Sequence, residues 1–181
     1  MLDNLMHDHV NIAALLKVLE HKLDLIRSEK SVKYKLIADI ITYLGDYADK
    51  YHHPREDAIY DYFCKYRADG LDISDKLARE HQKLHELTEE LDEVVQLILL
   101  DAVIPLDQFS QKLEHFISAQ WDHLNFEERE IFPLLKEKLT EDDWRIIEQN
   151  WEHSDYNDPL FGSKVEQHYS ALAERIRISE S

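Results

Sequence analysis

Apolar residues recur at helical spacing over long stretches of this chain, and few residues interrupt them. Glycine and proline contribute only 3 and 4 of the 181 residues, well below their usual shares of about 7% and 5%. Because sheet proteins use these residues at their many turns, their scarcity favours an all-α fold with short connections. The periodicity predicts helices over residues 2–27, 34–66, 74–98, 105–138, 140–151 and 160–178.

The four longest of these helices are joined by short links, which predicts an up-down antiparallel four-helix bundle. We expect the bundle to occupy residues 1–138 and residues 139–181 to form a short C-terminal helical appendage that packs on it. Pro54 lies inside the second helix and should kink it, because proline lacks the backbone donor that its turn needs. The segment Thr140–Asp143 has the composition of a helix start.

Acidic side chains outnumber basic ones by 38 to 21, which gives a net charge of −17. Nucleic acids and anionic membranes bind basic surfaces, so we expect neither as a partner. The longest apolar stretch, residues 94–100, is far shorter than the ~20 residues of a membrane span. The single cysteine, Cys64, fits a reducing compartment, and the N-terminus lacks the basic start of a secretory signal. These features predict a soluble, cytoplasmic protein.

A weak internal repeat places histidines and carboxylates at matching positions in the two halves of the bundle. In each half, an acid–His pair lies on the first helix and a His-x-x-x-Glu motif lies on the second, at offsets of 72 and 71 residues. Two such hairpins packed about a pseudo-twofold axis would bring all four helices to one centre. The matching segments are Asp8–His9 with Glu80–His81, and His52–Glu56 with His123–Glu127.

Residues four apart share a helix face, and the rows that carry these histidines and glutamates are otherwise apolar. An isolated inward histidine is usually an ordinary core residue, but a buried, unpaired carboxylate costs several kcal/mol. No lysine or arginine on these rows is placed to pair with the carboxylates. A pair of metal ions would neutralise them and use the imidazole lone pairs. The candidate ligands are His9, His52, Glu56, His81, His85, His123 and Glu127.

This pattern resembles the hemerythrin-like HHE cation-binding family over roughly residues 1–138. The most specific parts of the resemblance are the segments HHPREDAIYDYF and HLNFEEREIFPLL. The resemblance implies an up-down four-helix bundle that holds two iron ions, bridged by an oxo or hydroxo group. It also implies that the protein handles dioxygen, nitric oxide, peroxide or iron status. Zinc or manganese could substitute for iron in such a ligand set.

His85 determines how many coordination positions this implied centre leaves open. Two octahedral irons offer roughly twelve positions, of which the two bridging glutamates, five histidines and one bridging oxygen would fill all but one. A single open position suits a small diatomic ligand. Without His85, which lies one turn beyond His81, a second position opens. The alternative is that His85 lies behind the ligands or on the surface.

Several functions fit this centre, and the sequence does not choose among them. The leading interpretation is a metal-binding protein that binds or senses O2, NO or peroxide, or takes part in iron homeostasis. A metal-dependent oxidase or peroxidase-like enzyme is the chemical alternative, although no catalytic residues are assigned. A metal buffer, or a metal-stabilised interaction module, is the alternative from another class. The acidic surface and the appendage also suit a homodimer contact.

Residues around the proposed ligands carry weaker expectations. Asp57 and Glu128 directly follow the two motif glutamates, and they either orient ligating histidines or are simply solvated. Tyr60 is interpreted as a core residue. Five histidines are expected on solvated faces: His21, His53, His115, His153 and His168.

Overall fold

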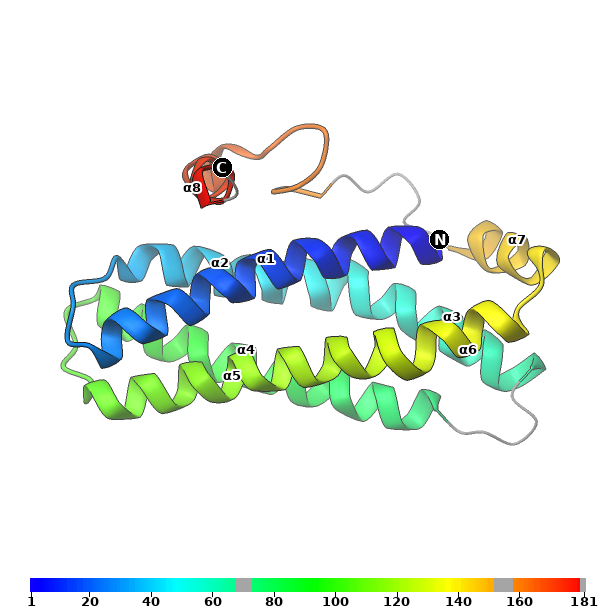
Figure 1. Cartoon of the computed structure of the whole chain (residues 1–181), viewed down its shortest axis with the longest axis horizontal. Coiled ribbons are helices and arrows are strands. Elements are labelled where there is room, and N and C mark those ends of the chain that lie inside the picture. The colour runs from blue at the N-terminus through cyan, green and yellow to red at the C-terminus, as the bar shows by residue number, and fades with distance from the viewer. Residues whose placement is uncertain (68–72, 152–157, 180–181) are drawn as a thin grey trace.

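The computed structural model describes residues 1–67, 73–151 and 158–179, and within these ranges it is helical and contains no strand (Figure 1). None of the helices in these ranges combines the length and the apolarity that crossing a membrane requires. The α-helices are α1 (Leu2–Arg27), α2 (Tyr34–Tyr47), α3 (His53–Tyr66), α4 (Ser74–Leu99), α5 (Leu106–Phe126), α6 (Phe132–Lys138), α7 (Glu141–Asn150) and α8 (Ser170–Ser179).

Four helical rods lie side by side: α1, α2 continued by α3, α4, and α5 continued by α6 (Figure 1). Helix α1 packs mainly on α5, and α4 packs on α2, α3 and α5. This confirms the all-α class, and the arrangement is compatible with the up-down four-helix bundle expected from the sequence.

Two of the rods contain a π-helical turn, and each turn ends shortly before a proline. Ala48–His52 separates α2 from α3, which carries Pro54 in its first turn. Glu127–Ile131 separates α5 from α6, which carries Pro133 in its first turn. A proline ring clashes with the carbonyl four residues earlier and lacks an N–H, and a wider turn relieves both problems. The sequence predicted an interruption at Pro54 but not the one at Pro133.

The core consists of two apolar clusters that lie at opposite ends of the rods. One contains Leu15, Ile41 and Phe116, and the other contains Leu5 and Ile59. Between them, on every rod, lie buried histidines and glutamates. The bundle therefore encloses a polar layer with apolar packing on both sides.

Residues beyond the bundle pack onto both apolar clusters. Ile147 of α7 joins one cluster, and Leu172 and Ile176 of α8 join the other, where α8 contacts α1 and α2. Thr140 and Asp143 form the capping box expected at the start of α7. The division of the chain into residues 1–138 and 139–181 stays a prediction.

The last helix is shorter than expected from the sequence. Residues 160–169 do not continue α8; they form turns and the short 3₁₀ helix Gln167–Tyr169. The Asp158 carboxylate accepts hydrogen bonds from the backbone N–H groups of Leu160 and Phe161. A side chain that captures backbone donors in this way competes with helix formation. Leu160 is nevertheless buried. An apolar residue at this position extended the helical pattern of residues 160–178 in the sequence.

Candidate metal centre

Six of the expected ligands converge in the polar layer, and together they come from all four rods. His9 lies on α1 and His81 on α4, while His52 and Glu56 lie where the second rod passes from its π turn into α3. All six side chains are buried, and the most exposed residue of the set is only 6% accessible. The six are His9, His52, Glu56, His81, His123 and Glu127.

The Nε2 atoms of the four histidines face the oxygens of the two glutamates. His9 Nε2 lies 3.4 Å from Glu56 Oε1 and 3.4 Å from Glu127 Oε2. Glu56 Oε1 is also 3.2 Å from His52 Nε2, and its other oxygen is 3.5 Å from His81 Nε2. Glu127 Oε2 lies 3.3 Å from His123 Nε2. Each carboxylate is therefore shared between histidines of different rods.

The Nδ1 atom of each of these histidines faces a second carboxylate. These outer carboxylates follow the internal repeat, because the two halves of the bundle use corresponding residues at corresponding positions. An acid of this kind fixes the orientation and tautomer of a ligating imidazole. The contacts are His9 with Glu128 (3.2 Å), His52 with Asp8 (3.3 Å), His81 with Asp57 (2.9 Å) and His123 with Glu80 (3.5 Å). Asp57 and Glu128 thus lie where they can orient ligands.

The polar atoms at the centre are poorly satisfied by one another, and a bound metal ion would satisfy them better. Five inward atoms have no hydrogen-bond partner among the described residues: His52 Nε2, His81 Nε2, His123 Nε2, Glu56 Oε2 and Glu127 Oε2. The ion-pair partners of both glutamates in the described chain are histidines, with no lysine or arginine among them. Buried polar atoms are normally satisfied, so a cluster of unsatisfied donors and acceptors fits bound cations.

The pKa values of the metal-free cluster also indicate that the two buried glutamates favour positive charge beside them. Burial lowers the pKa of His9, but Glu127 and Glu56 outweigh this effect and raise it to about 10. Burial also lowers the pKa of His81, but Asp57 and the two glutamates raise it to about 11. Burial and Glu56 raise the pKa of Glu127, while the surrounding imidazoles hold it down at about 2. Metal ions would take the place of the protons that these imidazoles hold.

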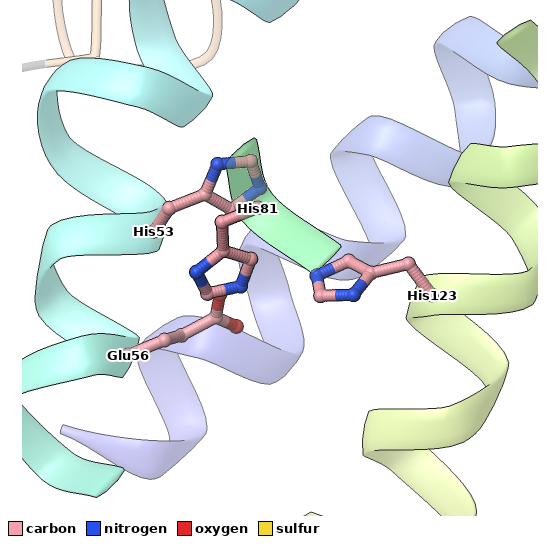
Figure 2. A group of neighbouring side chains, drawn as sticks. All are labelled: His53, Glu56, His81 and His123. Atoms are coloured by element: carbon pink, nitrogen blue, oxygen red, sulfur yellow. The ribbon is translucent and has the colours of Figure 1, made fainter. Parts of the chain in front are cut away.

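His53 is the main correction to the expected site. The sequence predicted a solvated position, but His53 is only 6% exposed, and its ring stacks on His81 with centroids 4.1 Å apart. Burial lowers its pKa to about 4, which leaves the imidazole neutral and able to ligate. Figure 2 shows His53, Glu56, His81 and His123 pointing toward a common centre.

The buried ligand atoms form two groups that share one residue. The first group is His53, Glu56, His81 and His123, and the second is His9, His52 and Glu56; within each group the ligand atoms lie within 4.8 Å of one another. Glu56 belongs to both groups. Its carboxylate therefore faces the ligand atoms of both groups.

His85 is not brought into either group. Its side chain is 40% exposed, its Nδ1 lies 2.6 Å from Asp49 Oδ2 and its Nε2 lies 3.4 Å from Glu89. The same Asp49 carboxylate also faces His53 Nδ1 at 3.5 Å, so His85 lies just outside the centre. His21 and His115 are exposed as expected, whereas His153 and the side chain of His168 lie outside the described part of the chain.

Tyr60 is the buried core residue that the sequence predicted, and it also contacts the centre. Its hydroxyl donates a 2.7 Å hydrogen bond to Glu127 Oε1, and the side chain is fully buried. Burial raises its pKa well above the ordinary value, so the hydroxyl keeps its proton and remains a donor. The available signal was its position one turn after Glu56 on the same inward row.

The fold and the site together define a helical protein with a buried histidine–carboxylate metal centre. The sequence model of the hemerythrin HHE cation binding domain matches residues 1–135. The chain therefore belongs to the hemerythrin HHE cation-binding family, as the sequence motifs indicated. A search of the curated proteins gave no match.

Proposed function

We propose that this protein holds two iron ions in the polar layer and uses them to bind or sense O2, NO or peroxide. The observation that carries the proposal is the position of Glu56 in both ligand groups. One carboxylate oxygen faces His9 and His52, and the other faces His81. A carboxylate with histidines on both oxygens suits a pair of cations better than a single one.

The residues divide into two sets around this shared carboxylate. His9 and His52 would hold one ion with Glu56, while His53, His81 and His123 would hold the other, with Glu127 completing the centre. An all-nitrogen-and-oxygen donor set suits iron and also accepts zinc or manganese. Iron supplies reversible binding of small ligands and electron transfer. The protein's own part is to fix the imidazoles through the outer carboxylates and to exclude bulk water with the apolar clusters on both sides.

Two surface cavities supply routes for a small molecule to reach the histidines. One, of about 320 Å³, is lined by His123 together with Glu80 and Phe126. The other, of about 310 Å³, is lined by His53 and His81. Both cavities reach the outer sides of these histidine rings, and their small volumes suit diatomic ligands.

The proposal includes the cellular compartment and the roles of the two parts of the chain. We place the protein in a reducing, cytoplasmic compartment, in keeping with its single cysteine, Cys64. We also propose that residues 1–138 carry the metal chemistry and that residues 139–181 serve as an extension of the bundle.

Absorption spectroscopy tests the function directly. Protein loaded with iron without oxygen should change its near-ultraviolet and visible spectrum on exposure to air, and separately on exposure to NO. Zinc-loaded protein should remain colourless under both treatments and controls for scattering. An iron-loaded protein whose spectrum responds to none of O2, NO and peroxide would contradict the proposal and favour a buffer or an interaction module.

A further inference from the structure

A third cavity lies away from the metal centre, where α8 packs on α1 and α2. It has a volume of about 520 Å³, within the range of small-molecule sites. Its apolar lining includes Ala14 and Val18 of α1, Leu36 of α2, and Leu172 and Ile176 of α8. Leu172 and Ile176 also belong to the core, so the apolar face of α8 is anchored and the cavity has a preformed floor.

The polar lining of this cavity is basic, in contrast to the rest of the molecule. Lys17, Lys22 and Arg175 line it together with His21, and none of the described residues in its lining is acidic. The whole chain has 38 acidic side chains against 21 basic ones, so a cavity with three cations and no acid departs strongly from the average surface. None of the three cations forms an ion pair with a described carboxylate.

We propose that this cavity binds a single-chain amphipathic carboxylate, a free fatty acid, with its alkyl chain on the apolar floor. Lysine and arginine can lay their stems along apolar surface while their charges stay in water, which places cations where the carboxylate of such a ligand would emerge. Charge complementarity therefore decides the occupant. A lipid headgroup within an anionic membrane is disfavoured, because the net charge of −17 repels such a surface.

Calorimetric titration of the full, metal-loaded chain with dodecanoate, below its micelle concentration, tests the proposal. We expect saturable binding of one molecule per chain. Because each buried CH2 contributes about 0.8 kcal/mol, decanoate should bind about fifteenfold more weakly than dodecanoate. Acetate, which could reach a metal but not fill the cavity, should not reproduce the signal. Dodecyltrimethylammonium, with the same chain and the opposite charge, should bind more weakly than dodecanoate.

Two cavity variants separate the contributions of charge and shape. The triple variant Lys17→Gln, Lys22→Gln and Arg175→Gln should bind dodecanoate about tenfold more weakly, since exposed pairs contribute up to about 1 kcal/mol each. Ala14→Phe, which fills the cavity, should weaken dodecanoate and dodecanol alike. The matched control replaces two lysines and one arginine that are exposed and outside the cavity, and it should bind like the parent: Lys30→Gln, Arg79→Gln and Lys136→Gln.

Several results would overturn the proposal. Absence of saturable dodecanoate binding by the parent chain would do so without any variant. Equal affinity for dodecanol and dodecanoate would show that the three cations do not contribute to binding. An unchanged affinity of the triple variant for dodecanoate would show the same. A dimer in sedimentation that dodecanoate does not dissociate, and that Ala14→Phe disrupts, would assign the cavity to a second copy of the chain instead.

Discussion

Tyr60→Phe removes one hydroxyl from the wall of the metal centre and leaves the rest of the ring in place. The lost hydrogen bond is 2.7 Å long, fully buried and accepted by the Glu127 carboxylate. Hydrogen bonds to charged groups contribute about 1.5–3 kcal/mol. At about 2–4 °C per kcal/mol for a chain of this size, we expect the melting temperature to fall by roughly 3–12 °C. Because the hydroxyl orients a proposed ligand, iron affinity should also fall about 10- to 100-fold.

Tyr43→Phe provides a matched control for this variant. Tyr43 is also fully buried, and its hydroxyl donates a 2.8 Å hydrogen bond to a carboxylate, Asp158, which is not one of the proposed ligands. Both variants should therefore lose stability, but only Tyr60→Phe should lose iron affinity. Calorimetric melting and competition with a chromogenic chelator measure the two effects. Equal iron affinities for the two variants would refute an orienting role for Tyr60.

Three further outcomes are expected. Removing the metal should lower the melting temperature by about 10 °C, since a ligand at 1,000 times its Kd adds about 4 kcal/mol to the stability of the fold; an unchanged melting curve would point to a metal-independent core. His53→Ala should weaken iron binding, whereas His85→Ala should leave the iron affinity near the parent value, although both imidazoles face Asp49. A chelator competition in which His85→Ala loses more iron affinity than His53→Ala would favour His85 as the ligand. The Arg67 guanidinium holds the pKa of Asp143 well below its ordinary value of 3.8, so this pair stabilises the fold above pH 3.8 and loses its effect as the pH falls through the lowered pKa. Asp143→Asn should therefore lower the melting temperature at pH 7, and a difference from the parent that stayed constant down to acid pH would contradict this.

The helical rods and most of the centre could be predicted because they depend on a regular 3.6-residue period. His9, Glu56 and His123 lie on apolar rows, and a continuous helix carries such rows into the core. The repeat then showed that the two halves use the same residue types at the same positions. Together these patterns located six buried histidines and glutamates of the polar layer without knowledge of their distances.

The period failed where the helix itself changes pitch. The π turn Ala48–His52 adds a residue to one turn of the second rod. At the end of this turn His52 and His53 are both buried, whereas the apolar row in the sequence pointed only to His52. The shortened last helix failed for a different reason, because capture of backbone donors by the Asp158 side chain leaves no trace in an apolar pattern.

The central claim is that two metal ions lie on either side of the Glu56 carboxylate. Anomalous X-ray diffraction at the iron edge, from crystals of the iron-loaded protein, tests it most directly. We expect two strong peaks in the polar layer, one next to His9 and His52 and the other next to His53 and His81. A single peak in that layer, or iron bound only elsewhere on the chain, would contradict the account.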